Sequence, residues 1–370
     1  MAALEALLRA RGLSVGKYTS PHLVHFGERI VVDGQPLPPH VVTEFVATHA
    51  DEVERLGATF FEATTALALD HFARQRVDVA VIETGLGGRL DSTNVLTPLA
   101  AVVTTIGIDH TEYLGHTVEE IAREKAGIFK PGVPAVVGDG DARIARLLAD
   151  LAREAGAAPV RVLVDEGWPA DVEVDGGGTV FTLPGAPGHR WRTPLVGRHQ
   201  AANAAAALLT LDALGPDFAL DAAARQRALD AVRIPGRFDR RGRFLFDVAH
   251  NPDGAAVVAR TLATVAPPRP VVALLAVLSD KDWRGMMTSL AAQVDRFVLT
   301  VAPTAPESRL WDPAEAAAFA AAQGWAATVE RDFVRAVTAA EAGAGTVLVT
   351  GSFHTVGDLL ARLPAASGAG

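Results

Sequence analysis

Residues 77–91, VDVAVIETGLGGRLD, decide the fold, because an apolar run ends at Glu83 and passes directly into a glycine-rich turn. The run 77–83 is continuous rather than alternating, which is typical of a strand buried on both faces of a parallel sheet. Glu83 is therefore expected at the carboxyl edge of that sheet, where α/β proteins bind ligands. The glycines let backbone amides approach an anion. A surface turn with a solvated glutamate would look the same, and Leu90 breaks the dinucleotide fingerprint.

Working outward, strand and helix patterns alternate along the chain. Further buried strands are predicted at 100–106, 244–249, 271–277, 296–301 and 346–351. Periodic Ala/Leu-rich helices are predicted at 40–56, 61–75, 117–126, 199–214, 253–265 and 313–322. This alternation indicates an α/β protein with a doubly wound parallel sheet. A hairpin is predicted at 172–183, and the segment near 215–236 suggests a boundary between domains 1–233 and 234–370.

The bulk composition narrows the class of protein. A chain of 370 residues, 49% hydrophobic and 21% charged, indicates two globular domains. The net charge of −9 and the lack of a long Lys/Arg run argue against nucleic acid and anionic membranes as partners. The absence of cysteine excludes disulfides and thiolate metal sites, and it fits a reducing cytoplasm, which is the expected location. No apolar window reaches the length of about 18 residues needed for a membrane span.

Two further clusters lie after or near predicted strand ends. Asp109 and His110 follow the strand at 100–106, and Lys125 lies at the end of the next helix. Taken alone, His110 would be a structural histidine and Lys125 a surface charge. Their occurrence together with Glu83 favours a functional site over these structural roles. Glutamate and hydroxyl oxygens and imidazole are reasonable ligands for Mg²⁺.

The remaining candidate residues are weaker when taken singly. Thr19 and Ser20 lie in a loop, because Pro21 forces Ser20 out of helical geometry, although a plain turn would look the same. His199 and Asn203 share a helix face, where capping is the alternative. In the second domain, polar groups follow predicted strands: Arg237, Asp247 and His250, Ser279–Asp282, and Ser352 at the start of a helix suited to an anion.

Taken together, these motifs resemble folylpolyglutamate synthase/dihydrofolate synthase, a family of the Mur ligase superfamily. The matching stretches are TSPHL (19–23), E-T-GLGGRLD-x-TN (83–94), IGIDHTEYLG (106–115), EEIAREKAGI (119–128), HQAANA (199–204), PGRF (235–238), DVAHNPDG (247–254), SDKD (279–282) and GSFHTVGDLL (351–360). They occur in order over about residues 2–362. The resemblance implies a P-loop-type parallel-sheet ATPase domain followed by a smaller Rossmann-like domain.

The resemblance also implies a reaction. L-Glutamate would be joined to dihydropteroate or to the glutamate tail of a reduced folate, with ATP cleaved to ADP and phosphate through an acyl phosphate. Such a transfer needs positioning and positive charge more than covalent help. The protein would be a cytoplasmic monomer that uses two Mg²⁺ ions.

Residue roles follow from the resemblance alone. Glu83, His110 and Lys125 would be catalytic, and the metal ions would be held by Ser20, Glu83, His110 and a carbamylated Lys125. ATP would contact His199, Asn203, Arg237, Asp247 and His250. The substrates would contact Thr19, Pro21, His22 and Ser352, with the pterin near TSPHL and FFEATT (60–65).

One departure from the family concerns the start of the chain. MAALEALLRARG (1–12) is predicted as an amphipathic helix with Leu4, Leu7 and Leu8 on one face and no capping residue before it. The family's phosphate loop, G-T-N-G-K-G-S, precedes this helix, and no G-x-x-x-x-G-K-S/T occurs here. We expect the first strand and this loop to be missing, through a misassigned start or a real truncation in a degenerate paralogue. The 370-residue chain alone is expected to be nearly inactive and poorly stable.

Other classes of protein stay open at this stage. A non-catalytic folate- or nucleotide-binding protein of the same fold would bind ligand without glutamate-dependent release of ADP. Another Mur-type ligase is disfavoured by the DVAHNP and TSPHL motifs. A metal-dependent hydrolase using Glu83 and His110 would lack an H-E-x-x-H or similar ligand set.

Overall fold

The computed structural model describes residues 1–186 and 188–363, and the chain divides into two compact units. The first unit comprises Met1–Glu173, Thr179–Pro194 and His199–Arg233. The second comprises Val174–Gly178, Leu195–Arg198 and the chain from Ile234 onward. The chain passes into the second unit for the last time after Arg233. The two short segments Val174–Gly178 and Leu195–Arg198, which also belong to the second unit, were not anticipated from the sequence.

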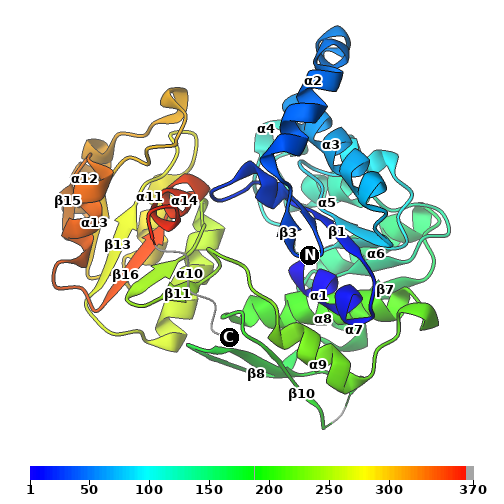
Figure 1. The fold of residues 1–370 in the computed structure, drawn as a ribbon. Helices are drawn as coiled ribbons and strands as arrows, with labels where there is room; N and C mark the ends of the chain where they lie inside the picture. The colour runs from blue at the N-terminus through cyan, green and yellow to red at the C-terminus, as the bar shows by residue number, and fades with distance from the viewer. Residues whose placement is uncertain (187, 364–370) are drawn as a thin grey trace. The chain divides into compact units, whose positions relative to one another are not determined.

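Among the described residues, three sheets are formed mainly by the first unit (Figure 1). A four-stranded sheet has the order β3-β2-β1-β4, from β1 (Val15–Tyr18), β2 (Ile30–Val32), β3 (Gln35–Pro36) and β4 (Val79–Ile82). A three-stranded parallel sheet is formed by β5 (Ala101–Val103), β6 (Ala135–Val137) and β7 (Val160–Val162). The third sheet contains β8 (Ala170–Asp175), β9 (Gly178–Thr182) and β10 (Arg190–Thr193), and β8 next to β9 matches the predicted hairpin.

Helices surround these sheets. They are α1 (Ala2–Ala10), α2 (Pro39–Leu56), α3 (Phe60–Gln75), α4 (Thr111–Leu114), α5 (Val118–Ala126), α6 (Ala142–Glu154), α7 (Leu163–Gly167), α8 (Arg198–Ala213) and α9 (Ala222–Asp230), with 3₁₀ turns η1 (Phe26–Arg29), η2 (Ser92–Val95) and η3 (Pro216–Phe218). The predicted helix at the start is confirmed as α1, in which Leu7 and Leu8 are buried. A capping box of Thr117 and Glu120 starts α5, which places Lys125 in its last turn.

The parallel core of the first unit is interrupted between β4 and β5. β1 pairs with β4 in parallel, and β5, β6 and β7 pair in parallel, but no pairing joins β4 to β5 in the described residues. One hydrophobic cluster nevertheless contains Val81 of β4, Val136 of β6 and the alanine-rich face of α8. The predicted parallel α/β sheet is therefore present in two pieces. The expected absence of a central strand stays a prediction.

The second unit is built on one six-stranded sheet in the order β11-β12-β16-β13-β14-β15. Its strands are β11 (Asp239–Arg241), β12 (Phe244–Phe246), β13 (Val271–Leu275), β14 (Arg296–Leu299), β15 (Ala327–Val329) and β16 (Thr346–Thr350). All pairs are parallel except β11 with β12. β13 is buried along its whole length, as expected for a central strand covered on both faces.

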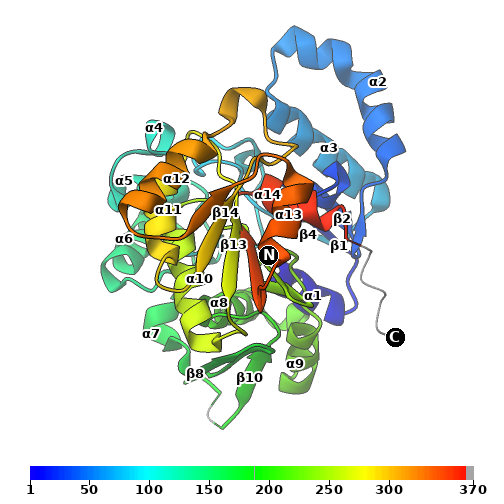
Figure 2. The ribbon, with the colours of Figure 1, turned by 90° about the vertical axis from the view of Figure 1, so that its left-hand side faces the viewer.

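Helices cover both faces of this sheet, with α10, α11 and α12 on one side and α13 and α14 on the other (Figure 2). They are α10 (Pro252–Val265), α11 (Trp283–Leu290), α12 (Pro313–Ala322), α13 (Phe333–Glu341) and α14 (Phe353–Leu360), with a 3₁₀ turn η4 (Glu307–Arg309). The main core of the unit joins Ala273 and Leu275 of β13 to α10 and α11. The doubly wound Rossmann-like arrangement predicted for this part is confirmed.

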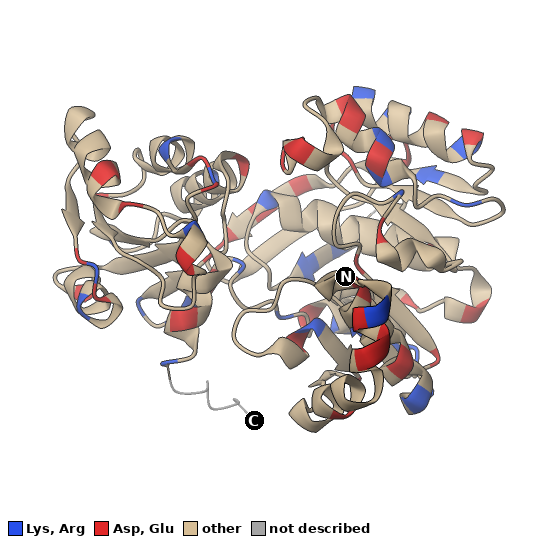
Figure 3. Ribbon diagram, turned by 90° about the horizontal axis from the view of Figure 1, so that it is seen from above, with Lys and Arg blue, Asp and Glu red and all other residues tan. Residues whose placement is uncertain are grey.

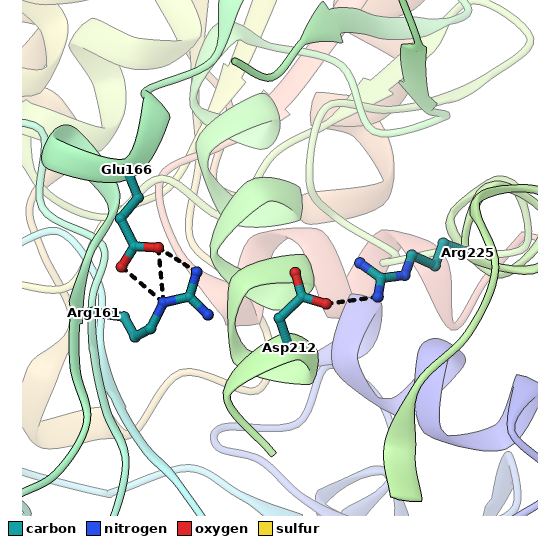
Figure 4. Close-up of polar contacts among 4 residues, drawn as sticks. All are labelled: Arg161, Glu166, Asp212 and Arg225. Atoms are coloured by element: carbon teal, nitrogen blue, oxygen red, sulfur yellow. Dashed lines mark hydrogen bonds and ion pairs between the residues drawn. The ribbon is translucent and has the colours of Figure 1, made fainter. Parts of the chain in front are cut away.

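Two ion pairs of the first unit, one on α8 and one between β7 and α7, are shown in Figure 4. Arg225 donates to Asp212 of α8 at 2.6 Å, and Arg161 pairs with Glu166 on α7. Acidic and basic residues are interspersed along both units (Figure 3). Among the described residues, no helix has the length and apolar character needed to cross a membrane.

Candidate active site

Ser20 and Glu83 meet at the carboxyl ends of two neighbouring parallel strands. Tyr18 of β1 lies opposite Ile82 of β4, so the residues that follow leave the sheet at the same edge. The Glu83 amide donates to the Tyr18 carbonyl at 2.9 Å, and the Ser20 amide donates to Oε2 of Glu83 at 3.0 Å. The structure thus brings together the TSPHL loop and the strand end that the sequence singled out separately.

The glycine-rich loop after Glu83 packs directly on the end of α5. A Cβ atom on Gly88 would lie 2.6 Å from the Lys125 carbonyl oxygen, and one on Gly127 would lie 2.4 Å from Cα of Arg89. Only glycine fits at such close backbone contacts. The Arg89 amide also donates to the Glu124 carbonyl at 2.9 Å, and the two side chains pair at 3.0 Å. This contact places the end of α5, with Lys125, beside the loop that follows Glu83.

Lys125 is partly buried among carboxylates. Burial lowers the pKa of its ammonium group, while the charges of Glu83, Asp109 and Asp91 act in the opposite direction. These interactions place Lys125 within electrostatic range of Glu83 and of the loop that carries His110. Because its pKa is lowered, more of the amine is neutral at a given pH than for an exposed lysine, and a neutral amine is a nucleophile.

His110 lies at the start of α4, next to Asp109. Its φ of 50° is in the left-handed region, which is uncommon for a residue with a side chain. Its backbone amide donates a hydrogen bond to Oδ1 of Asp109 at 2.8 Å. Backbone strain of this kind concentrates at functional sites. His110 is thus an exposed residue in a turn that a local hydrogen bond fixes.

The donor groups at this edge of the sheet fit a magnesium ion that is shared with a nucleotide. In the described residues no three His, Cys, Asp or Glu side chains converge as a ready-made metal site. Glu83, Asp109 and Ser20 nevertheless offer oxygen ligands, and Mg²⁺ commonly takes one or two carboxylates together with waters and phosphate oxygens. Lys125 does not fit as an ammonium ion, because its positive charge would repel the metal.

An arginine that the sequence analysis did not single out lies in an aromatic cluster next to the TSPHL loop. Nε of Arg29 donates to Nδ1 of His22 at 2.9 Å, and its guanidinium lies 5.4 Å from the ring centroid of Phe60. Burial lowers the pKa of Arg29. Phe60 is 64% exposed, so one face of the cluster is open to a planar ligand. No local sequence pattern singles out Arg29, because Phe60 lies on a separate helix.

Thr19 and Pro21 belong to the same loop. The Thr19 amide donates to the Arg29 carbonyl at 2.9 Å, which ties the loop to η1, and Pro21 is exposed. His199 and Asn203 lie on the first turns of α8, both exposed and linked through Gln200. The Gln200 side chain contacts Nε2 of His199 at 3.0 Å and accepts from Asn203 at 3.1 Å. His199 and Asn203 thus share one face of α8, as predicted.

In the second unit the predicted residues Arg237, Asp247 and His250 lie together. Burial raises the pKa of Asp247 to about 6, and the charges of Arg237 and His250 oppose this shift. Asp247 accepts hydrogen bonds from the amides of Phe238 at 3.0 Å and Ala249 at 2.9 Å. Phe238 has a φ of 50°, so the residue after Arg237 is strained. A network of backbone contacts thereby fixes both Arg237 and the end of β12.

Ser352 lies at the start of α14 but has a structural partner. Its hydroxyl accepts from the Thr355 amide at 3.1 Å, which caps the helix, and the residue is 3% exposed. The predicted contact of Ser352 with a substrate stays a prediction. The next residue, Phe353, lies beside Arg237 and His250. Its ring is 5.8 Å from the Arg237 guanidinium and 5.8 Å from the His250 ring.

Known proteins share both the sequence and the fold. Residues 39–211 match the Mur ligase middle domain, and residues 236–353 match the Mur ligase, glutamate ligase domain. Dihydrofolate synthase/folylpolyglutamate synthase from Escherichia coli (strain K12) is 36% identical over 96% of this chain and 82% of its own length.

Solved structures of similar sequence have the same fold as this chain. E. coli FolC in complex with DHPP and ADP has a TM-score of 0.85 and 34% identity, covering 98% of this chain and 84% of that one. A bifunctional folylpolyglutamate synthase/dihydrofolate synthase with Mn, AMPPNP and L-glutamate bound has a TM-score of 0.80 and 34% identity, covering 98% and 85%.

The fold and the matched domains define a ligase of the Mur superfamily. Within that class, the chain belongs to the dihydrofolate synthase/folylpolyglutamate synthase family.

Proposed function

We propose that this protein joins L-glutamate to dihydropteroate, to the glutamate tail of a reduced folate, or to both, with ATP cleaved to ADP and phosphate. The observation that carries the proposal is the convergence of Glu83, Lys125 and the Asp109–His110 turn at one edge of the first unit's sheets. The named relatives support the substrate class, because solved family members bind DHPP, ADP, AMPPNP and L-glutamate. We also propose domain limits of 1–233 for the ATP-binding part and 234–370 for the second domain.

The chemistry requires an activated carboxylate. A carboxylate does not react with an amine, so it first attacks the γ-phosphorus of ATP, forming an acyl phosphate and releasing ADP. The amine of glutamate then attacks the acyl carbon, forming the amide and releasing phosphate. Two bound Mg²⁺ ions would neutralise phosphate charge during the first transfer. This chain's part is to hold the reacting groups in place and to keep water out.

We assign the metal ligands to Ser20, Glu83, His110 and a modified Lys125. The neutral amine of Lys125 can add to CO₂, which forms an N–C bond and releases one proton. The resulting carbamate is an anionic oxygen ligand, so this step removes the charge conflict that an ammonium group would create. Burial of Lys125 favours the neutral amine that this step needs.

The remaining groups would bind the organic substrates. We assign Arg237, Asp247 and His250 to ATP from the second unit, and His199 and Asn203 to ATP from the first. Thr19, Pro21 and His22 would contact the folate substrate, with Arg29 and Phe60 forming a platform for the pterin. Ser352 is proposed to contact a substrate. We propose that the protein acts as a monomer in the cytoplasm.

The decisive experiment measures glutamate-dependent ADP release from the purified protein, with dihydropteroate or tetrahydrofolate as acceptor. We expect ADP release only when acceptor, glutamate and ATP are all present. A protein that binds nucleotide and folate but releases no ADP would instead be a non-catalytic member of the family.

A further inference from the structure

Glu28 lies in η1, at the end of the loop that follows β1, and the proposed reaction gives it no role. Its side chain is half-buried. Its Oε2 accepts from the Leu23 amide at 2.8 Å, and its Oε1 accepts from the amides of Val24 at 3.2 Å and His25 at 2.9 Å. One carboxylate therefore binds three successive backbone amides of the loop.

These three amides belong to a stretch without secondary structure, since residues 19–25 lie outside the helices and strands. Backbone amides that are partly withdrawn from water need an acceptor, which a neighbouring strand or a helical turn would normally supply. Here the Glu28 carboxylate supplies it. The side chain thereby fixes the path of the backbone from residue 23 to residue 25.

The two ends of the loop are fastened by other groups. At the start, the Thr19 amide donates to the Arg29 carbonyl at 2.9 Å. At the end, the Leu37 amide donates to the Gly27 carbonyl at 3.2 Å, and a Cβ atom on Gly27 would lie 2.3 Å from the Leu37 carbonyl oxygen. The middle of the loop is thus the part whose conformation depends on Glu28.

Two aromatic side chains flank this middle part. His22 precedes the three bound amides and Phe26 follows them, and their ring centroids lie 6.2 Å apart in an edge-to-face contact. Phe26 also lies 6.2 Å from the exposed ring of Phe60. The separation of His22 from Phe26 depends on the path of the backbone between them, which is the path that Glu28 fixes.

We propose that Glu28 is a positioning residue for the folate substrate: by binding the amides of residues 23–25, it sets the placement of His22 and Phe26 beside Phe60. Glu28 acts through these aromatic side chains. Its loss is therefore expected to weaken the binding of the pterin-bearing substrate and to leave the binding of ATP unchanged. The inference rests on the proposed function, which assigns this loop to the folate substrate.

The test compares Glu28→Gln with Glu120→Gln in the purified protein. Glutamine keeps the length of the side chain but replaces one acceptor oxygen by an NH₂ group, which faces an amide that needs an acceptor. Glu120 is a matched control, because its carboxylate also accepts from successive backbone amides, those of His116 at 2.7 Å and Thr117 at 3.1 Å. Both variants lose the same kind of contact, but only Glu28 lies in the loop.

Steady-state kinetics and calorimetry decide the proposal. In E28Q, KM for the folate acceptor and the Kd of dihydropteroate, measured by isothermal titration calorimetry, are expected to rise about tenfold or more, because small displacements of positioning groups are costly. KM for ATP should stay nearly unchanged, and E120Q should alter none of these values. An unchanged Kd for dihydropteroate in E28Q, or an equal rise in KM for ATP, would overturn the positioning role.

The binding measurement also separates this inference from the proposed function. If the wild type binds dihydropteroate but releases no ADP, the proposed ligase activity fails, and the Kd in E28Q still decides the role of Glu28. If the wild type binds no dihydropteroate, the inference fails with its substrate. If E28Q does not fold, Glu28→Asp keeps the charge but shortens the reach of the carboxylate. A smaller rise in Kd is expected for E28D, and no rise would contradict the proposal.

Discussion

The amide of Ser20 donates a 3.0 Å hydrogen bond to Oε2 of Glu83, which couples the loop after β1 to the strand end after β4. The carboxylate is thereby oriented by backbone, so its position does not depend on a flexible partner side chain. The charge of this carboxylate also interacts with that of Lys125.

The first prediction concerns the charge of Glu83. Glu83→Gln keeps an acceptor for the Ser20 amide but removes the negative charge that a divalent cation needs. We expect glutamate-dependent ADP release to fall by about 100-fold or more, and Mn²⁺ affinity to fall with it. Steady-state kinetics and Mn²⁺ titration measure the two effects.

Glu120→Gln is the matched control for that variant. Glu120 accepts from the amides of His116 and Thr117 at the start of α5, so its loss weakens a cap and leaves the site alone. E120Q is expected to keep its ADP release and metal affinity. Equal losses in E83Q and E120Q would show that the effect is general destabilisation.

The second prediction concerns carbamylation of Lys125. Because burial lowers the pKa of the amine, the fraction able to add CO₂ increases as pH rises through that lowered pKa. With ¹³C-labelled bicarbonate, we expect a carbamate signal in the wild type that grows with pH. Lys125→Arg should show neither the signal nor ADP release, since a guanidinium remains protonated.

Lys130→Arg is the corresponding control, because Lys130 donates to the carbonyls of Asn94 and Leu96 and is already engaged by its own partners. It should retain the carbamate signal. A signal that survives in K125R, or that disappears in K130R, would assign the modification to another residue.

Much of this site followed from the sequence because its parts are local. Glu83, His110 and Lys125 each follow a predicted strand or end a predicted helix, and the parallel-sheet rule then places them near one edge. Arg29 was missed because its importance depends on Phe60, which lies on another helix. Ser352 illustrates the opposite case: its position after β16 was clear, but the burial of its hydroxyl as a helix cap could not be read from the pattern.

Short strands also escaped the sequence analysis. β1 and β6 were not predicted, since VGKY (15–18) and AVV (135–137) are too short for periodicity to separate them from loops. β1 also contains Lys17, whose charge interrupts the apolar pattern of a buried strand. Lys17 pairs with Glu5 at 2.6 Å, and this contact between α1 and β1 cannot be predicted from a local sequence pattern.

The third prediction concerns the contact between the glycine-rich loop and α5. Gly88→Ala would place a methyl group 2.6 Å from the Lys125 carbonyl oxygen, and backbone on both sides has to move. We expect a loss of about 1–3 kcal/mol in the free energy of unfolding, measured with urea, together with a large loss of ADP release. Gly185→Ala is the control, because nothing lies within 4 Å of its Cβ position. Similar stability of the two variants would contradict the close packing.

The fourth prediction concerns pH and Asp247, whose pKa burial raises from 3.8 to about 6. A carboxyl with a higher pKa in the folded state contributes stability that is fully present below the unfolded value and is lost as pH rises through the folded value. The unfolding free energy of the wild type, minus that of Asp247→Asn, should fall by a few kcal/mol between about pH 4 and about pH 7.

Asp280→Asn provides a comparison of opposite sign. Hydrogen bonding to Arg309 lowers the pKa of Asp280, so its contribution is present at neutral pH and is lost as pH falls through the lowered pKa. The wild type minus D280N difference should therefore decrease towards acid. A flat difference for D247N across the same range would mean that Asp247 is not the titrating group.

The last prediction tests the aromatic cluster at Arg29. Its guanidinium lies 5.4 Å from the Phe60 ring centroid and binds His22, so Arg29→Ala removes a cation beside an exposed aromatic face. If the pterin or its attached benzoate lies there, KM for the folate substrate should rise about tenfold or more, with KM for ATP nearly unchanged. Arg55→Ala, which loses only an exposed pair with Glu52 on α2, should alter neither value. A rise in KM for ATP in R29A, without a rise for folate, would place the folate elsewhere and make Arg29 part of the nucleotide site.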